Sequence, residues 1–339
     1  MKKWITRIAI GLLSIVVLAV IVGAAYEAIA RAQAAMEFPA PGRLVDIGGG
    51  RHIQLDCRGA GVPVVVFESG LDSLGSLSWT AVHDAIAQTT RACAYSRAGI
   101  MWSDPSDRPF SGANVAEDLH RTLTAAGEQG PYIMVGHSLG GPYLLTYTRR
   151  YGGEVAGLVF VDASHPDQIA RMRAAVGKDL AQPTTLVRVA ASLVWTGLVR
   201  VALWNAPPTP PNASAAINGS SAAWFATSLR SMAQELEGLA ATLTIAVEAR
   251  QLGDRPLVVL TRGEKSRPDD LEEMQLTNEQ GDCLDVLWGA LQADEATWST
   301  RSRHETVPHA SHHIQFDQPQ AVIAAVHDVI DQVRQASPK

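Results

Sequence analysis

The sequence has no sustained run of lysine and arginine beyond its N-terminus, and its formal net charge is -6. Proteins that bind nucleic acid through the phosphate backbone normally present a basic patch. We therefore expect no nucleic-acid partner. The chain also lacks an internal repeat, and its 47% hydrophobic content argues against disorder on a large scale. Its 339 residues are enough for one large domain or two modest ones.

Grouped metal ligands are also scarce in the sequence. His304, His309, His312 and His313 cluster near the C-terminus, but they do not form an i, i+4 pair on a predicted helix. No cysteine or carboxylate set accompanies them of the kind that zinc sites use. We expect neither a metal nor a cofactor.

Cysteine is rare, with three residues in the chain. Cys57 ends one predicted strand and Cys93 begins another. If the two strands are neighbours in an oxidising compartment, a disulfide forms between them; two buried free thiols are the alternative, because spacing does not reveal connectivity. Cys283 lies in a polar segment and is expected to be unpaired.

A long apolar segment stands close to the N-terminus. Three basic residues precede an uncharged run from Ile8 to Tyr26, which is 19 residues long. About 20 residues span the core of a bilayer, so we predict an uncleaved anchor over residues 1–33, followed by a linker within Ala34–Gly42. The alternative is a secretory signal that is cleaved near Ala28-Ile29-Ala30. In both cases the basic end stays in the cytoplasm, and the rest of the chain is membrane-anchored or secreted outside it.

Short apolar runs rich in β-branched residues alternate with helical patterns after the linker. This alternation predicts an α/β domain whose mostly parallel sheet is covered on both faces. The expected strands are a hairpin of Arg43–Ile47 and Arg51–Cys57, and then Pro63–Glu68, Ala92–Tyr95, Tyr132–Gly136, Leu158–Asp162 and Leu257–Thr261.

The alternation stops between His165 and Arg250, where no strand pattern is present. We predict that residues 165–250 form a helical cap over one edge of the sheet, between two parts of the core at 34–164 and 251–339. The apolar residues from Leu193 to Leu203 are expected to pack on the core or to line a substrate cavity.

The most specific motif is Gly136-His137-Ser138-Leu139-Gly140-Gly141, which directly follows a predicted strand and precedes a helical pattern. A serine between a strand and a helix lies on a tight turn, and the flanking glycines allow close approach of the two elements. The turn exposes the hydroxyl, and the N-terminus of the helix supplies N–H groups where an oxyanion would develop. We predict that Ser138 is a nucleophile and that the backbone of Leu139 donates to the oxyanion.

An oxyanion hole needs a second donor, and the loop after the strand Pro63–Glu68 is its natural source. Gly70 permits a close backbone approach there, so the N–H of Leu71 is the candidate. Without the serine motif, an ordinary glycine turn would be the preferred interpretation.

Ser138 must transfer its proton to a base. His312 lies in a loop that leads into the last predicted helix, where the base belongs in the chain order nucleophile, acid, histidine. His313 is the adjacent alternative. His137, next to the nucleophile, is expected to have a structural role.

The chain after the anchor resembles the α/β-hydrolase superfamily, and in particular its bacterial membrane-anchored or exported serine hydrolases. Three features carry the resemblance: the serine motif, the segment Tyr95–Gly99 with Trp102–Asp104, and Leu158–Gln168 with Ser311–Pro319. The second is similar to the segment after the fourth strand of these hydrolases, and the third to their sixth strand and histidine loop. The resemblance implies an eight-stranded, mostly parallel sheet flanked by helices. It also implies that the strands of Cys57 and Cys93 are neighbours, which favours the disulfide.

The sequence departs from the superfamily pattern at the acid. Many members carry Asp in a Gly-x-x-Asp stretch after the seventh strand, whereas this chain has Gly263-Glu264-Lys265-Ser266. Other members take the acid from the end of the sixth strand, which here is Asp162. We expect Asp162 to complete the triad, with Asp269 as the alternative acid. An Asp162 that only satisfies a helix or loop terminus is the non-catalytic explanation.

The predicted activity is hydrolysis of a carboxylic ester through an acyl-enzyme. Haloalkane dehalogenases and epoxide hydrolases of this fold use an aspartate nucleophile, so a serine at position 138 argues against both. The alternatives are an amide or prolyl-peptide hydrolase with the same triad and a non-catalytic, membrane-tethered binding protein of the same fold.

Overall fold

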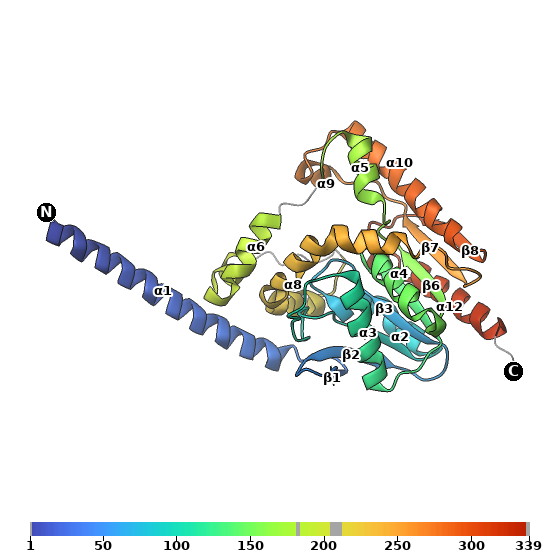
Figure 1. Cartoon of the computed structure of the whole chain (residues 1–339), viewed down its shortest axis with the longest axis horizontal. Coiled ribbons are helices and arrows are strands. Elements are labelled where there is room, and N and C mark those ends of the chain that lie inside the picture. Colours follow the sequence, from blue (N-terminus) through green and yellow to red (C-terminus); the bar gives the residue numbers. More distant parts are fainter. Residues whose placement is uncertain (1, 181–183, 204–211, 337–339) are drawn as a thin grey trace.

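The computed structural model of the chain describes residues 2–180, 184–203 and 212–336. Its centre is an eight-stranded sheet in the order β1-β2-β4-β3-β5-β6-β7-β8, antiparallel from β1 to β4 and parallel from β4 to β8. Helices cover both of its faces, so the predicted fold class is confirmed (Figure 1). The strands are β1 (Arg43–Asp46), β2 (His52–Arg58), β3 (Val64–Glu68), β4 (Ala92–Tyr95), β5 (Tyr132–His137), β6 (Val155–Val161), β7 (Leu257–Arg262) and β8 (Ser302–Val307).

The central strands are apolar on both faces because each face is covered. In β5, Ile133 and Val135 pack toward one layer of helices, whereas Tyr132 and Met134 pack toward the other. A continuous apolar run is typical of a parallel strand that is buried on both sides. The helices of the core are α2 (Thr80–Ala87) and α12 (Pro319–Ala336) on the first side, and α3 (Gly112–Ala126) and α4 (Gly140–Tyr151) on the second.

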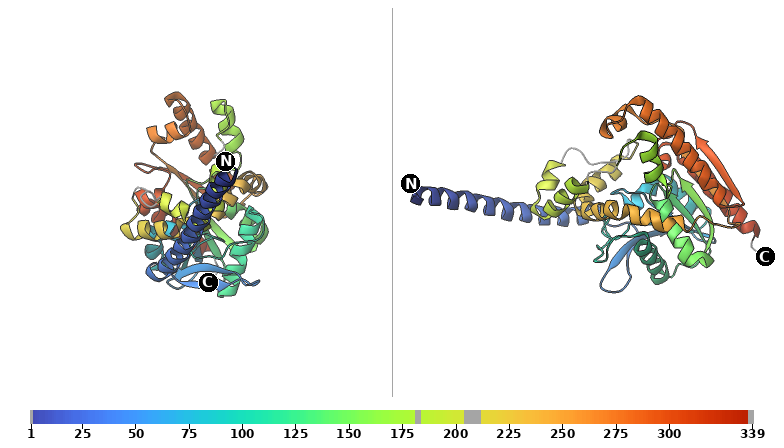
Figure 2. Two further views of the ribbon diagram at one scale, coloured as in Figure 1. Left: turned by 90° about the vertical axis from the view of Figure 1, so that its left-hand side faces the viewer. Right: turned by 45° about the horizontal axis from the view of Figure 1, so that its top comes forward.

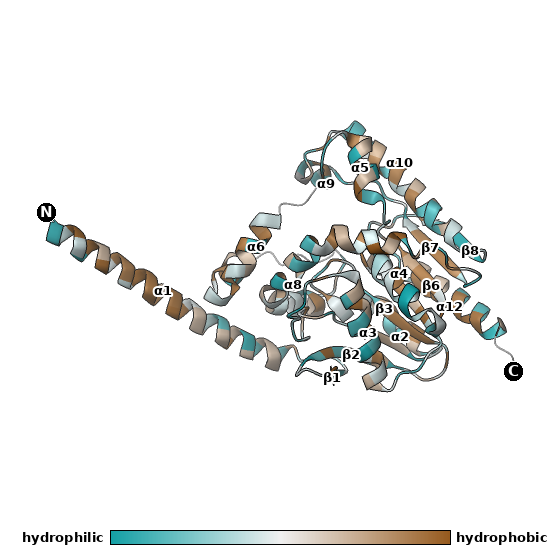
Figure 3. Cartoon of the chain, in the orientation of Figure 1, coloured by the Kyte–Doolittle hydropathy of each residue, from teal (hydrophilic) through white to brown (hydrophobic). Residues whose placement is uncertain are grey.

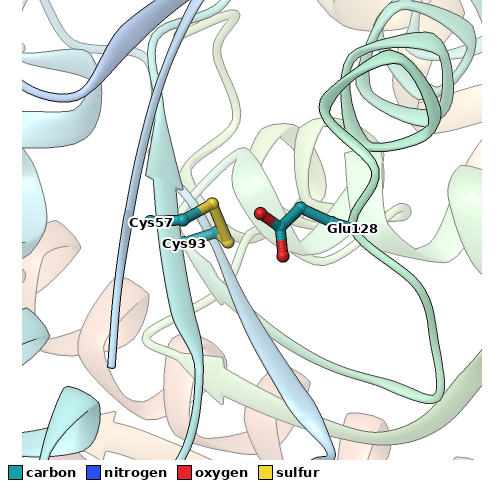
Figure 4. Close-up of side chains that lie close together, drawn as sticks. All are labelled: Cys57, Cys93 and Glu128. Atoms are coloured by element: carbon teal, nitrogen blue, oxygen red, sulfur yellow. A yellow bond between two sulfur atoms is a disulfide. The ribbon is translucent and has the colours of Figure 1, made fainter. Parts of the chain in front are cut away.

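The pairing of β2 with β4 puts Cys57 opposite Cys93, and a disulfide joins the two residues. Figure 4 shows the carboxylate of Glu128 close to the two sulfur atoms. Both sulfurs are used in the disulfide, and both oxygens of Glu128 accept hydrogen bonds from Arg91. The group is therefore a structural crosslink next to an ion pair, without free thiolates.

The predicted cap region contains helices and, in its described part, no strand. Its elements are α5 (Gln168–Val176), α6 (Thr184–Leu193), η3 (Val194–Thr196), α7 (Leu198–Ala202) and the long α8 (Ala215–Val247). The expected packing holds for Val194 and Val199, which are buried against α8. It is wrong for Leu193, Trp195, Leu198 and Val201, which expose 39% to 61% of their surface.

The N-terminal helix α1 (Lys2–Glu37) projects away from the rest of the molecule (Figures 1 and 2). Of the described helices it is the one that is long and apolar enough to cross a membrane, and Figure 3 shows its long hydrophobic stretch. It continues to Glu37, so the predicted linker begins too early. The helix ends there because Phe38 precedes Pro39, and a residue before proline disfavours the helical conformation.

A second difference from the sequence prediction is that the polar segment around Cys283 forms a helix, α10 (Asn278–Glu295). Thr277 and Gln280 form a capping box at its start. Leu284, Trp288 and Leu291 recur at helical spacing and are buried. Cys283 lies on this helix, exposed and unpaired. The remaining elements are the short α9 (Pro268–Glu273), α11 (Ile314–Asp317), η1 (Gly75–Trp79), η2 (Gly152–Glu154) and η4 (Ala296–Trp298).

Candidate active site

The candidate nucleophile Ser138 lies on the turn between β5 and α4, with a φ of +51°. A non-glycine residue in this left-handed region is strained, and such strain concentrates at functional sites. The flanking glycines allow the turn, because a Cβ on Gly136 would come within 2.8 Å of Leu144, and one on Gly140 within 2.5 Å of the Glu68 carbonyl. The turn leaves the Ser138 side chain partly exposed at the carboxyl edge of the sheet.

The two candidate oxyanion donors lie on either side of this serine. Gly70 approaches so closely that a Cβ there would be 2.8 Å from the Cβ of Ser138, which brings the β3 loop next to the nucleophile. Within the described residues, the N–H groups of Leu71 and Leu139 donate no hydrogen bond to any protein acceptor. Two unpaired donors beside a nucleophile are what an oxyanion hole requires.

The candidate base and acid are in direct contact. The Nδ1 atom of His312, in the loop after β8, is 2.6 Å from Oδ2 of Asp162, which directly follows β6. Asp162 is fully buried and has a φ of +45°. The alternative acid Asp269 is exposed on α9 and, among the described residues, makes no hydrogen bond to either histidine of the loop.

Asp162 is held in the charged form by its neighbours. Its oxygens accept further hydrogen bonds from the Arg262 backbone at 3.0 Å, from the Arg262 guanidinium at 3.0 Å and from Trp288 Nε1 at 2.8 Å. Burial by itself raises the pKa of Asp162, but the hydrogen bond from His312 and the charge of Arg262 outweigh it. The pKa of this carboxyl is therefore held well below its usual range.

His137 connects the serine turn to the histidine loop. Its Nε2 donates a 2.8 Å hydrogen bond to the carbonyl of His312. Burial and the adjacent His312 and His313 rings hold the pKa of His137 well below its usual value. His137 is therefore neutral at physiological pH. Its hydrogen bond holds the loop that carries His312 against the turn that carries Ser138.

The other histidine of the loop, His313, is less suited to act as the base. Burial and the neighbouring His312 lower the pKa of His313 to about 4. Its ring makes no hydrogen bond among the described residues, whereas the His312 ring is oriented by Asp162. A general base works best when its partner fixes its tautomer and orientation.

The hydroxyl of Ser138 has no hydrogen-bond partner in the part of the chain that the structure describes, so the contact with His312 is not formed in this state. Such contacts are often long in the absence of substrate and tighten when it binds. Asp162 occupies the Nδ1 side of the His312 ring, and Nε2 is left for the serine.

A cavity of about 1050 Å³ opens beside these residues. Leu71 and His312 contribute to its wall, as do Met232 of the cap and Arg262 at the end of β7. Its lining combines apolar and charged side chains, which suits a small molecule with both kinds of group.

A buried ionic network lies beneath the loop after β3, which contains Ser69, Gly70 and Leu71 and which we call the oxyanion loop. Arg97, after β4, donates to Glu68 at 2.7 Å and to both oxygens of Glu235 on α8 at 3.0 and 2.8 Å. It also donates to the carbonyls of Ser69 at 2.7 Å and Gly70 at 2.6 Å. Burial raises the pKa of Glu68 to about 7 although Arg97 opposes the shift. Arg97 thus holds the segment that precedes Leu71 and ties it to the cap.

Several residues of this site were not predicted from the sequence, namely Arg97, Glu235, Arg262 and Trp288. Only Trp288 had a usable signal, the helical spacing of Leu284, Trp288 and Leu291. The ionic contacts join segments that are far apart along the chain, and no local pattern marks them.

Comparison with known proteins agrees with this architecture. A family model described as the alpha/beta hydrolase fold matches residues 62–193. The chain is 37% identical over 136 residues to a probable transporter of Hormonema carpetanum, which is 38% of this chain and 19% of that protein. It is 40% identical over 78 residues to an uncharacterized protein of Schizosaccharomyces pombe, 23% of this chain and 15% of that one. The chain thus spans less than a fifth of these relatives, both of which are fungal.

Solved structures match over a larger part of the chain. An epoxide hydrolase, CorEH, superposes with a TM-score of 0.60 at 16% identity, covering 86% of this chain and 98% of that one. A thermophilic esterase from Thermogutta terrifontis gives a TM-score of 0.50 at 18% identity, with 86% and 97% covered. Identities this low establish the fold alone. The chain has the α/β-hydrolase fold, and its residues 62–193 match the family model of that fold.

Proposed function

We propose that the chain is a serine hydrolase that cleaves carboxylic esters through an acyl-enzyme, with its catalytic domain outside the cytoplasm. The observation that carries the proposal is the 2.6 Å contact between His312 and the buried Asp162 next to the strained Ser138 turn. A base oriented by a buried carboxylate beside an exposed hydroxyl is the arrangement that nucleophilic acyl transfer uses.

In the proposed reaction, Ser138 Oγ attacks the ester carbonyl while His312 Nε2 accepts the serine proton. The N–H groups of Leu71 and Leu139 stabilise the oxyanion, each contributing about 2.7 to 4 kcal/mol by comparison with deletions of such donors. Asp162 remains ionised and stabilises the imidazolium. His312 then protonates the leaving alcohol, and a water molecule releases the acyl group by the reverse sequence.

The nucleophile separates this proposal from the activity named for some structural neighbours. An epoxide hydrolase superposes on the chain, but epoxide hydrolases of this fold use an aspartate where this chain has Ser138. The esterase neighbour is in line with acyl transfer. Ester cleavage is therefore favoured over epoxide opening, and amide cleavage with the same triad is the alternative.

The first test is labelling with a fluorophosphonate probe, which reacts with activated serines. We expect the full-length chain to be labelled and the Ser138→Ala variant to be unlabelled. Ser266→Ala is the matched control, because Ser266 lines the same cavity while its hydroxyl is bonded to Asp285 at 2.7 Å. Absence of labelling in folded protein would contradict the proposal and favour a binding role.

The second test separates the two hydrolytic reactions. Hydrolysis of p-nitrophenyl esters of increasing chain length is compared with hydrolysis of aminoacyl and prolyl amides. We expect esters to be cleaved with the higher kcat/KM; faster amide turnover that depends on Ser138 would replace the ester assignment.

A further inference from the structure

Six large apolar side chains of the cap are exposed to solvent. Leu186, Val189 and Leu193 follow one another along α6 at helical spacing, and Trp195, Leu198 and Val201 continue from η3 into α7. Their exposed fractions are 70%, 49%, 39%, 56%, 61% and 61%. We call these six residues the cap stripe. Contiguous exposed apolar surface of this kind marks an interaction site rather than a core.

The η3 end of the cap stripe lies directly beside the apolar helix α1. The η3 turn packs on α1 so closely that a Cβ on Gly23 would come within 2.1 Å of the Thr196 carbonyl. On the other side, a Cβ on Gly197 would be 2.7 Å from the carbonyl of Gly23. In Figure 1 and in the right-hand view of Figure 2 this part of the cap is next to α1, whereas α10 is distant from it.

An ion pair fixes the same contact. Glu27 of α1 accepts hydrogen bonds from Arg200 of α7 at 2.7 and 3.0 Å. The side chains are only 3% and 9% exposed, so the pair is largely removed from water. Breaking such a pair leaves a buried charge, which makes the contact between α1 and the cap hard to separate.

This geometry sets the depth of the cap stripe relative to the apolar run of α1. The run Ile8–Tyr26 has the length of a bilayer core, and Gly23 lies three residues inside its end. At about 1.5 Å per residue, the contact with Thr196 is about 4.5 Å inside the apolar boundary. If α1 crosses a bilayer, η3 and its neighbours cannot remain in water.

We propose that the cap stripe is a membrane-docking surface that inserts into the surface of the bilayer through which α1 passes. The occupant is phospholipid, because η3 packs against α1, whose long run of apolar side chains is exposed. Amphipathic helices bury their apolar face about 5 to 10 Å into the boundary between headgroups and acyl chains. Trp195, at the turn between α6 and α7, is the residue type that favours this interface.

The test uses single-cysteine variants of the full-length chain in a Cys283→Ser background. Cys57 and Cys93 are joined to each other, so a thiol-reactive NBD dye labels only the introduced cysteine. Leu198→Cys reports on the cap stripe, and Ile15→Cys reports on the middle of the apolar run of α1. Val286→Cys on α10 is the matched control, because it is an apolar residue with 77% exposure far from α1.

The labelled proteins are reconstituted in phosphatidylcholine vesicles with and without nitroxide-labelled lipid. We expect quenching at position 198 comparable to that at position 15, and no quenching at position 286. A position 198 that is as poorly quenched as 286 overturns the proposal, as does equal quenching at all three positions. A signal at 198 that depends on protein density but not on the nitroxide would indicate a second copy of the chain instead.

The variant Gly23→Leu tests the role of the contact with α1. A side chain there cannot coexist with the Thr196 carbonyl, so quenching at 198 should fall while quenching at 15 stays. Undiminished quenching at 198 would overturn the proposed geometry. These measurements need no substrate and are independent of the proposed hydrolysis.

Discussion

Asp162 receives four hydrogen bonds although solvent does not reach it. Three of these bonds come from Arg262 and Trp288, neither of which belongs to the proposed triad. A carboxylate satisfied in this way remains ionised and keeps a fixed position, so it can orient the His312 ring without accepting its proton. These contacts favour Asp162 over Asp269 as the candidate acid of the proposed triad.

Replacement of the acid should distinguish Asp162 from Asp269. We expect Asp162→Asn to lower the turnover of a p-nitrophenyl ester by a factor on the order of 10⁴, because the imidazole loses its orientation and tautomer. Asp269→Asn, at an exposed position on α9, should leave turnover near that of the unmodified chain. A small effect at Asp162 together with a large one at Asp269 would reverse the assignment.

The pKa of His313 predicts the direction in which the free energy of unfolding changes with pH. The value of about 4 in the folded chain is below the value of about 6.5 expected in the unfolded chain. Between these values the unfolded state binds more protons, so the free energy of unfolding falls as pH decreases from about 6.5 to about 4. Denaturant titrations across this window in detergent should show a shallower decline for His313→Gln. Identical slopes for both proteins would contradict the burial of this ring.

Much of the proposed triad could be predicted at this scale because its signals are local. Ser138 lies in a short motif, and His312 and Asp162 follow from chain order and strand ends. The same reasoning left Asp269 open, since the usual acid position is Ser266. Trp288 and Arg262, whose contacts with Asp162 favour it, come from separate elements and have no motif.

At the scale of elements, the oxyanion loop and the cap meet at a single guanidinium. Arg97 is 2% exposed and binds the carbonyls of the loop after β3 together with Glu235 of α8. A shift of α8 would therefore be transmitted to the loop that carries Leu71. The cap is thereby connected to the chemistry even though it supplies none of the proposed catalytic groups.

Replacement of Arg97 should lower the free energy of unfolding. Arg97→Met leaves Glu68 and Glu235 buried without a positive partner, and we expect a loss of about 3 to 5 kcal/mol in the free energy of unfolding. Arg303→Met is the control, because Arg303 and Glu305 form an exposed pair that is worth about 0 to 1 kcal/mol. Equal losses in denaturant titrations of the two variants would show that the network is not a coupled unit. Arg97 lowers the pKa of Glu68, which is about 7 in its presence, so the substitution raises this pKa further. The cost of replacing Arg97 should therefore shrink as the pH falls toward about 7, because Glu68 becomes protonated in the variant first.

The elements themselves were predictable where periodicity was simple. β3 to β7 coincide closely with short apolar runs, whereas α10 was missed because charged residues interrupt its buried positions. The end of α1 was misplaced because Ala34 to Glu37 are good helix formers, and Pro39, rather than the change in composition, stops the helix.

At the scale of the whole molecule, the long apolar helix α1 is joined to the cap by the Glu27–Arg200 ion pair and by the close contact of Gly23 with Thr196. The exposed fraction of the cap stripe could not be predicted from the sequence, since apolar residues in an insertion normally pack inward. Only the positions of α8 and α1 decide which of them are buried. Val194 and Val199 face α8, and the four residues around them do not.

A negative charge introduced into the cap stripe should lower the rate of hydrolysis of membrane-borne substrates but not of soluble ones. We expect Trp195→Glu to leave the hydrolysis of short soluble esters unchanged, because Trp195 is not among the residues that line the cavity. Hydrolysis of long-chain esters dissolved in vesicles should decrease, since a carboxylate disfavours insertion into the interface. Parallel rate measurements on the two substrates would show this, and equal losses on both would indicate a folding defect.

The Glu27–Arg200 pair has a consequence for how the protein searches for its substrate. A domain on a flexible linker changes its orientation freely and samples bulk solution. A domain fixed to its N-terminal helix keeps a constant orientation and distance relative to that helix. If α1 lies in a bilayer, the domain stays close to the lipid surface, so its encounters with substrate depend on molecules per unit area rather than per unit volume.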